Sequence, residues 1–326
     1  MRAVTLRAPG RIEVDENWPE PLLRPSEVLV DVRGVGLCGS DASVVAGHRA
    51  VPELPWVLGH EAYGVISRVG SAVADRHEGQ TVVIEPNYPC FACDACSAGA
   101  TSGCPNRRIV GISEPGMLAE RVAVPAGFAW PVPSGWAAED IVCVEPLSVA
   151  FNAVGLAGIR PGGRCLVLGA GSQGQFVCLA ARQAGADVHV IDPHPGRLAL
   201  ALDLGARPDD GGDHPVIIET SGAVSAFEQA VDRASHGGII VVVGQSRTPA
   251  TVSTFRIVQR RLTIRGCLIY DHPQGFARTI AAMTGSGLRP GRVLRARYGL
   301  EDASRAFAES AGNPGKTWIS LEEKPA

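Results

Sequence analysis

Four cysteines lie close together in one loop of the sequence. Cys90, Cys93, Cys96 and Cys104 follow the spacing C-x2-C-x2-C-x7-C among prolines and glycines, while the other five cysteines lie singly. Four thiolates that converge form the closed tetrahedral coordination of a structural zinc ion, with no position left for water. An iron–sulfur cluster accepts the same ligands, but the last interval does not match the ferredoxin spacing. We therefore predict a structural zinc site, with unliganded free cysteines as a weaker alternative.

A glycine-rich segment later in the chain has the chemistry of a dinucleotide site. Its pattern G-x-G-x-x-G comprises Gly169, Ala170, Gly171, Ser172, Gln173 and Gly174. The first glycine permits a tight turn, the second lets the backbone approach a pyrophosphate, and the third lets a helix pack closely on a strand. Because the segment follows a predicted strand and opens a predicted helix, we prefer this interpretation to an ordinary glycine-rich turn.

An acidic residue favours NAD as the dinucleotide. Asp192 ends the next apolar run, 18 residues after Gly174, which is close to the ~20 at which a carboxylate binds the ribose hydroxyls. A carboxylate there would repel a 2′-phosphate, so we expect NAD rather than NADP. Arg197, five residues further on, weakens this choice because an arginine could hold the phosphate instead.

A third group of potential ligands is scattered along the chain. Cys38, His60, Glu61 and Glu145 are residue types that bind zinc. Each also has an ordinary interpretation, since a single cysteine is often a small core residue and a single glutamate a charge on a helix face. Their spacing alone leaves both interpretations open.

The first 150 residues or so predict short strands separated by glycine and proline. Glu27–Arg33 alternates apolar and polar residues as a half-buried strand does, and 61–66 and 81–84 resemble it. This pattern predicts a β-barrel. A helix follows over Ala137–Val154, with Ser134 as its expected N-cap.

From Arg164 onward, apolar strands alternate with amphipathic helices. Such a pattern predicts a parallel sheet that helices cover on both faces, and thus a doubly wound α/β domain. The residues after Arg292 contain one further short strand and a helix at 302–310, and they could join either domain. The expected strands are 165–168, 188–191, 216–218, 239–243 and 262–264, and the expected helices run through Ala181 and over 196–204.

The composition of the 326 residues is that of an ordinary globular protein of two domains. Apolar residues make up 45% and charged residues 19% of the chain, which excludes a disordered protein. A formal net charge of −3 without long runs of one sign predicts no nucleic-acid partner. Residues 1–16 lack the apolar core of a secretory signal, and no stretch reaches the ~18 apolar residues of a membrane span. We therefore expect a cytoplasmic protein with no membrane partner.

Five motifs in order give the chain a family resemblance. Gly-Leu-Cys-Gly-Ser-Asp at 36–41, Gly-His-Glu at 59–61, the four-cysteine loop, Glu-Pro-Leu-Ser at 145–148 and the glycine-rich segment resemble the zinc-dependent medium-chain alcohol dehydrogenases. Glu145, where the simple alcohol dehydrogenases have cysteine, is similar to the polyol, sugar and threonine dehydrogenase branch. The resemblance implies a GroES-like barrel over 1–148, a Rossmann NAD-binding domain over 149–285, and a segment 286–326 that returns to the barrel.

The resemblance also implies roles for the scattered residues. Cys38 and His60 would bind a catalytic zinc, the second zinc of the chain, and Glu61 and Glu145 would complete its shell directly or through water. Two ionised glutamates on the metal would leave a net charge of −1, so we expect one of them on zinc at a time. Asp41 would orient His60. Ser40 would carry the alcohol proton, although it could instead be a turn-capping serine.

The implied reaction is hydride transfer between a secondary alcohol and NAD, giving the ketone. Many relatives carry a histidine where this chain has Ser43, and sorbitol dehydrogenases carry a tyrosine and an arginine where it has Val44 and Ile269. Missing donors favour a ring sugar, a cyclitol or a less hydroxylated alcohol over sorbitol, and His48, Ser43 or water would complete the proton path. The alternatives are a sugar 1-dehydrogenase that uses NAD or NADP, and a non-catalytic nucleotide-binding protein. The family further implies a homodimer or homotetramer built through the Rossmann sheet edge.

Overall fold

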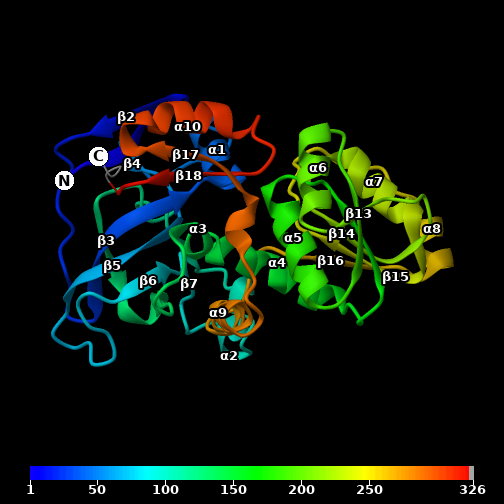
Figure 1. Ribbon diagram of the computed structural model, residues 1–326, viewed down its shortest axis with the longest axis horizontal. Coiled ribbons are helices and arrows are strands. Elements are labelled where there is room, and N and C mark those ends of the chain that lie inside the picture. Colours follow the sequence, from blue (N-terminus) through cyan, green and yellow to red (C-terminus); the bar gives the residue numbers. More distant parts are fainter. Residues whose placement is uncertain (323–326) are drawn as a thin grey trace. The chain divides into compact units, whose positions relative to one another are not determined.

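The computed structural model describes residues 1–322. The chain divides into two compact units, each of which is described by itself: Met1–Glu145 together with the residues from Ile280 onward, and Pro146–Thr279. The first unit is mainly β-structure and the second alternates strands and helices (Figure 1).

The first unit contains a curved, mainly antiparallel sheet in the order β10-β6-β5-β3-β18-β17, with β9 also paired to β3. Its longest strand is β3 (Glu27–Gly36), which continues three residues beyond the predicted strand. Val28, Val30 and Val32 lie at alternate positions of β3 and are all at most 4% exposed. Because alternate residues of a strand face the same side, these valines form one wall of the core.

Two strands from the C-terminal part belong to this sheet, where the sequence analysis expected one strand after Arg292. β17 (Leu294–Gly299) pairs in parallel with β18 (Lys316–Ser320), and β18 pairs antiparallel with β3. Figure 1 shows β18 (red) beside β3 (blue), although some 280 residues separate them in the chain. The pairing brings the residues around Lys316 next to the end of β3.

The helix predicted over Ala137–Val154 is two helices. α3 (Ala138–Ile141) has Ala137 as its N-cap, with no side-chain cap, so the expected capping role of Ser134 is wrong. α4 (Val144–Ala157) begins three residues after α3 ends. Pro146 lacks the N–H that a continuous helix would need to bond the Val142 carbonyl, and proline is tolerated only in the first turn of a helix. The break therefore places Glu145 and Pro146 in the first turn of α4.

The second unit is a six-stranded parallel sheet in the order β13-β12-β11-β14-β15-β16. In chain order this is 3-2-1-4-5-6, the order of a Rossmann fold. The central strand β11 (Arg164–Leu168) is an apolar run whose last four residues are at most 1% exposed. Helix α5 packs on β11 and β12, and α7 packs on β14 and β15. The expected doubly wound α/β class is confirmed.

One strand of the second unit, β13 (Arg207–Pro208), is not among the strands that the sequence pattern predicts. Short apolar runs signal buried strands, and β13 is an exposed two-residue strand containing proline, so it gives no such signal.

No helix in the described part of the chain is long and apolar enough to cross a membrane. The other bounds are β1 (Ala3–Ala8), β2 (Arg11–Asp15), α1 (Gly39–Val45), β4 (Trp56–Val57), β5 (Glu61–Val69), β6 (Thr81–Ile84), β7 (Asn87–Tyr88), α2 (Asp94–Ser97), β8 (Arg108–Ile109), β9 (Arg121–Pro125), β10 (Ala129–Pro131), α5 (Ser172–Gln183), β12 (Asp187–Ile191), α6 (Pro195–Asp203), β13 (Arg207–Pro208), β14 (His214–Glu219), α7 (Val224–Arg233), β15 (Ala234–Val242), α8 (Thr254–Arg260), β16 (Thr263–Gly266), α9 (Gln274–Ser286) and α10 (Ala303–Ser310), with single 3₁₀ turns at Thr101–Gly103, Ala126–Phe128, Pro290–Val293 and Leu300–Asp302.

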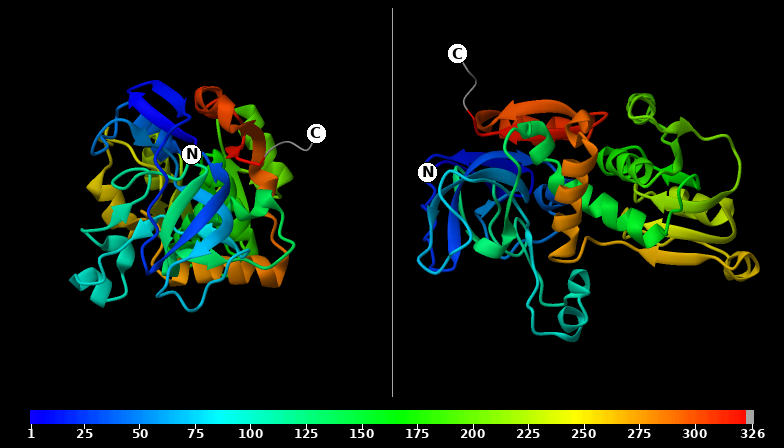
Figure 2. Two further views of the ribbon diagram at one scale, coloured as in Figure 1. Left: turned by 90° about the vertical axis from the view of Figure 1, so that its left-hand side faces the viewer. Right: turned by 60° about the horizontal axis from the view of Figure 1, so that its bottom comes forward.

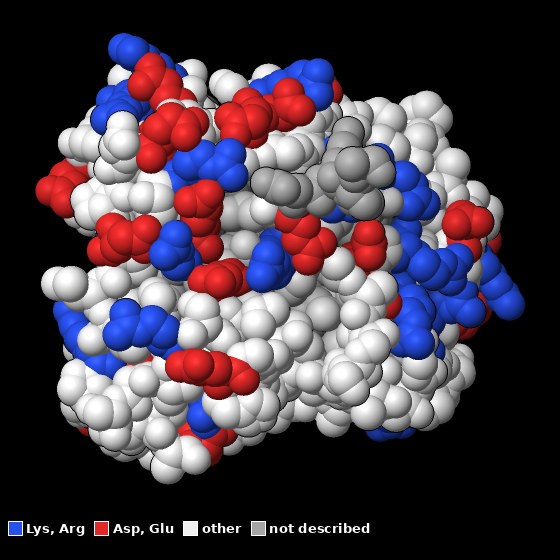
Figure 3. Space-filling model, turned by 60° about the vertical axis from the view of Figure 1, so that its left-hand side comes forward, with Lys and Arg blue, Asp and Glu red and all other residues white. Residues whose placement is uncertain are grey.

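Acidic and basic side chains lie side by side on the face that Figure 3 shows. Arg2 pairs with Glu120 and Glu301, and Arg7 pairs with Asp15, at distances of 2.7–2.8 Å. The mixture of charges along the sequence thus gives local ion pairs in the first unit. Such exposed pairs each contribute about 0–1 kcal/mol to stability.

Candidate functional site

Three of the predicted ligands meet at one end of the barrel sheet. Cys38 follows β3 as the N-cap of α1, and His60 and Glu61 stand at the start of β5. Since β3 and β5 are antiparallel, with Gly36 opposite Glu61, the end of one strand lies beside the start of the other. One ligand atom of each of the three residues lies within 4.8 Å of those of the other two. The structure therefore brings together a thiol, an imidazole and a carboxyl group.

Asp41 ties two of these residues together. One oxygen of its buried carboxylate, Oδ2, accepts a 3.0 Å hydrogen bond from the backbone N–H of Cys38. The other, Oδ1, lies 2.9 Å from Nδ1 of His60. With Nδ1 held in this way, Nε2 is the nitrogen left for a metal. Asp41 therefore fixes both the start of α1 and the orientation of the His60 ring.

The electrostatics of the site support that role. Burial lowers the pKa of the His60 imidazole, but the negative charge and hydrogen bond of Asp41 outweigh it and raise this pKa well above its ordinary value. His60 therefore holds a proton more readily than an ordinary imidazole does, and a metal ion that binds it would displace that proton.

The serines near the site differ in their environments. The thiol of Cys38 lies 3.7 Å from the hydroxyl oxygen of Ser40, which is partly exposed. Ser43 donates a 3.0 Å hydrogen bond to the Gly39 carbonyl within α1. Val44 is 1% exposed and belongs to the core of the barrel, so in this chain it serves packing. Of these positions, Ser40 is the one whose hydroxyl lies beside the potential ligands.

Glu145 is buried at 5% exposure in the first turn of α4, and it is not part of the group formed by Cys38, His60 and Glu61.

The sequence analysis missed one charged residue that lies beside the group of Cys38, His60 and Glu61. Lys316, at the start of β18, is 2% exposed and forms a 2.5 Å ion pair with Glu61. Burial lowers the pKa of Lys316, but Glu61 and Cys38 outweigh it and raise this pKa above its ordinary value, so Lys316 is a cation. The available signal was a lysine at the start of a short strand, Lys316–Ser320, that contains Trp318 and Ile319.

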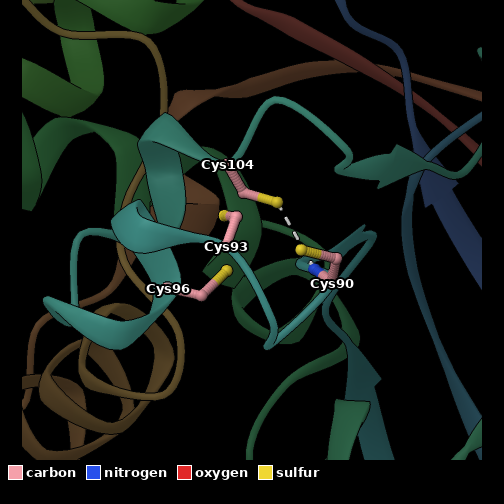
Figure 4. A group of neighbouring side chains, drawn as sticks. All are labelled: Cys90, Cys93, Cys96 and Cys104. Carbon is pink, nitrogen blue, oxygen red and sulfur yellow. Dashed lines mark hydrogen bonds between the residues drawn. The ribbon is translucent and has the colours of Figure 1, made fainter.

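The four clustered cysteines form a second group. β7 and β8 pair antiparallel at its base, and the loop between them projects from the barrel in both views of Figure 2. In Figure 4 the four side chains turn toward one another from the loop and from α2, and their sulfur atoms all lie within 4.8 Å of each other. The backbone N–H of Cys90 donates a 3.4 Å hydrogen bond to the sulfur of Cys104. This is the arrangement that tetrahedral thiolate coordination requires.

The thiols of this loop titrate differently from one another. A backbone hydrogen bond from Ala92 lowers the pKa of Cys90 to about 6. Desolvation and a hydrogen bond with its neighbour Cys93 raise the pKa of Cys96 to about 11. A zinc ion requires all four as thiolates, so metal binding to this loop releases protons and strengthens as the pH rises.

The glycine-rich segment connects β11 to α5 as predicted. Gly169 has a φ of +92°, the left-handed region that glycine adopts without strain. A Cβ on Gly174 would lie 2.0 Å from the carbonyl oxygen of Gly169, whereas a Cβ on Gly171 would meet nothing within 4 Å. Gly174 is thus needed for close helix–strand packing, and the backbone at Gly171 is open to an approaching ligand. Ser172 begins α5, and Gln173 donates a hydrogen bond to the Pro146 carbonyl.

Asp192 lies beside this segment. It follows β12, and its Oδ2 accepts a 2.6 Å hydrogen bond from the backbone N–H of Ala170, while Oδ1 accepts one of 2.7 Å from that of His194. Arg197 lies in the first turn of α6, where its backbone N–H donates to the ring of the N-cap His194. Asp192 and the glycine-rich segment, the two parts of the predicted dinucleotide site, are therefore in direct contact.

A third group of potential ligands, Asp209, Asp210 and His214, is already occupied by ion pairs. Arg233 bonds both oxygens of Asp209 and Arg164 both oxygens of Asp210, at 2.6–3.0 Å. The carboxylates of this group are therefore engaged in ion pairs within the second unit, and we do not assign a metal site to them.

The family model described as the alcohol dehydrogenase GroES-like domain matches residues 24–134, and the one described as zinc-binding dehydrogenase matches residues 210–285. Among curated proteins, a probable D-xylulose reductase A of Aspergillus niger is 30% identical, with 95% of this chain and 94% of the relative covered. A 2-dehydro-3-deoxy-L-galactonate 5-dehydrogenase of Pseudoalteromonas atlantica is 31% identical over 88% of this chain and 89% of the relative.

Solved structures resemble the chain over nearly its whole length. A short chain alcohol dehydrogenase from Escherichia coli CFT073, complexed with NADH, has a TM-score of 0.92 at 26% identity and covers 98% of this chain and 99% of its own. A zinc-binding dehydrogenase from Sinorhizobium meliloti 1021, bound to NADP, has a TM-score of 0.89 at 29% identity with 98% of both chains covered.

Proposed function

Because this chain belongs to the zinc-dependent medium-chain alcohol dehydrogenase superfamily, in its polyol and sugar dehydrogenase branch, we propose that it oxidises a secondary alcohol of a hydroxylated small molecule to the ketone with NAD. The observation that carries the proposal is the meeting of Cys38, His60 and Glu61, with ligand atoms within 4.8 Å of one another. In the reaction the alcohol carbon gives up a hydride to the nicotinamide, and the hydroxyl gives up a proton.

The donor set fits a zinc ion. Thiolate, imidazole and carboxylate are the three ligand types that zinc takes in proteins, and three protein ligands leave a position open for substrate. Cys38, His60 and either Glu61 or Glu145 would hold the ion. When bound, zinc acts as a Lewis acid that lowers the pKa of a hydroxyl group, as it lowers that of water from ~15.7 to ~7. The four-cysteine loop would hold the second, structural zinc.

The other residues of the site would bind and orient. Asp41, which holds both the Cys38 backbone and the His60 ring, would keep these two ligands in place. The Ser40 hydroxyl, 3.7 Å from the Cys38 sulfur, would accept the proton of the substrate alcohol and pass it toward solvent. All nine cysteines are free thiols, which suits action in the reducing cytoplasm.

NAD would bind at the glycine-rich segment with Asp192 on its ribose hydroxyls. Replacing Asp192 by serine is expected to raise the ratio of kcat/KM for NADP to that for NAD by about tenfold or more, because the repulsion between the carboxylate and a 2′-phosphate is removed. Steady-state kinetics with both cofactors would measure the ratio. Asp187→Asn, at the start of the same strand β12, is the matched control, and an unchanged ratio in Asp192→Ser would contradict the assignment.

The substrate class is tested by cofactor reduction on a panel of alcohols. We expect turnover with NAD on ring polyols, cyclitols or sugar acids, because the chain has Ile269 where a linear polyol would need a polar partner. Oxidation of aldoses at C1 with NADP would favour the sugar 1-dehydrogenase alternative. No reduction with any secondary alcohol, by protein that holds two zinc ions, would contradict the proposed substrate class.

A homodimer or homotetramer would form through the edge strand β16. Its four residues are all exposed, and Phe255, Val258 and Ile264 of α8 and β16 expose 71%, 69% and 38% of their surface. Such an edge is a template for strand pairing between chains. Ile264→Lys combined with Val258→Asp should shift the molar mass by light scattering toward that of one chain. Leu22→Asp, at an 89% exposed leucine of the first unit, is the control and should leave the mass unchanged.

A further inference from the structure

Lys316 is a buried cation whose contacts lie next to two proposed zinc ligands. Its Nζ donates a 3.0 Å hydrogen bond to the carbonyl oxygen of Leu37 and lies 2.5 Å from Oε2 of Glu61. Leu37 directly precedes Cys38, and Glu61 directly follows His60. One side chain from β18 thus holds the two backbone segments that carry the ligands.

The surrounding structure packs closely around this ion pair. The side chains of Lys316 and Glu61 are 2% and 1% exposed. A Cβ on Gly36 would lie 2.3 Å from Oε2 of Glu61 and 2.9 Å from Cε of Lys316, so the pair fills the space that a glycine leaves open. Breaking a buried pair by removing one partner leaves an uncompensated charge. The pair therefore fixes both the position and the charge of the Glu61 carboxylate.

The charges of the proposed site balance only when Lys316 is included. A zinc ion with the thiolate of Cys38, a neutral His60 and the carboxylates of Glu61 and Glu145 sums to −1, and the cation of Lys316 returns the sum to zero. We propose that Lys316 is a positioning residue that holds Glu61 beside the zinc ligands and cancels its charge. This inference rests on the proposed function, because it concerns the same metal site.

The test is zinc affinity, measured by titrating the metal-stripped full chain against a chromophoric zinc chelator. Lys316→Gln keeps a donor for the Leu37 carbonyl and removes the charge. The dissociation constant of the zinc at Cys38 and His60 should fall about tenfold or more, because a cation no longer repels the dication and Glu61 is released toward it. If Lys316 had a merely structural role, Lys316→Gln would bind this zinc more weakly than the parent or equally well, and either result would overturn the proposal.

Two further variants isolate the charge. Lys316→Arg keeps the cation and should bind zinc as the parent does, within about twofold. Glu61→Gln combined with Lys316→Gln removes both charges and should return the affinity toward that of the parent. Should Lys316→Gln fail to fold, the double variant is compared with Glu61→Gln alone: tighter zinc binding in the double variant is expected, and equal binding overturns the proposal.

The same titration separates this inference from the proposed function. The zinc of the four-cysteine loop is identified as the one lost in Cys93→Ser. A parent protein that binds this zinc alone would overturn the catalytic metal site, and with it the proposed function. Two zinc ions in the parent, with no tightening in Lys316→Gln, would overturn the role of Lys316 alone.

Discussion

Cys38→Ser should reduce kcat/KM for alcohol oxidation by about a thousandfold or more and lower the zinc content from two ions per chain to one. Partners that merely orient a ligand typically change affinity or activity 10–100-fold, and the loss of a direct thiolate ligand should exceed this range. Steady-state cofactor reduction and elemental analysis of the same preparation measure the two effects. The variant should remain folded, because Cys38 is a partly exposed N-cap of α1 and serine is a favoured N-cap residue.

The control for this variant is Cys267→Ser, at a cysteine of the second unit outside both clusters. It should keep two zinc ions and retain activity. If Cys38→Ser retained the parent's rate, the site at Cys38 and His60 would not be catalytic, whatever its metal content.

Cys93→Ser should lower the thermal midpoint by about 10 °C or more and remove the other zinc. The loop between β7 and β8 has only short elements, α2 of four residues and a 3₁₀ turn of three, so metal binding would supply most of its folding free energy. Structural zinc sites in small peptides supply about 10–16 kcal/mol. A loss of a few kcal/mol shifts the midpoint of a domain of 150–250 residues by roughly 2–4 °C per kcal/mol.

Calorimetry and limited proteolysis would check this expectation. Cleavage within the loop should accelerate in Cys93→Ser and in the parent treated with a chelator, but not in Ser97→Ala, which changes an exposed residue of the same helix α2. A midpoint and cleavage rate equal to those of the parent would contradict a structural zinc in this loop. Together with Cys38→Ser, this variant assigns one zinc ion to each cysteine group.

Local sequence patterns predicted the features that depend on neighbours in the chain. The segment 169–174 connects a strand to a helix because its glycines meet turn and packing requirements that are set by residues only a few positions away. The apolar runs of β11 and β12 form strands within a residue of their predicted bounds. The four cysteines converge because they share one loop. The order of five motifs also predicted the family, which the comparisons confirm.

Other features depended on pairing between distant segments. The sequence pattern left open which domain the last residues join, and the pairing of β18 with β3 decides it. The single helix expected over 137–154 is instead the two helices α3 and α4, and Pro146 was the local signal for this break because proline is tolerated only in the first turn of a helix. Spacing alone likewise could not tell whether Cys38 and His60 meet, because their proximity follows from the antiparallel register of β3 and β5.

The sequence by itself therefore determined the residue types of this protein's chemistry: the thiols, the imidazole, the carboxylates and the glycine turn. The tertiary structure decided which of them act on one another. Lys316 shows the difference most clearly, since 255 residues separate it from Glu61 in the chain and 2.5 Å separate the charged atoms in the fold. A buried charge takes its partner from whatever the fold places beside it, and that neighbour is set by strand pairing rather than by local sequence.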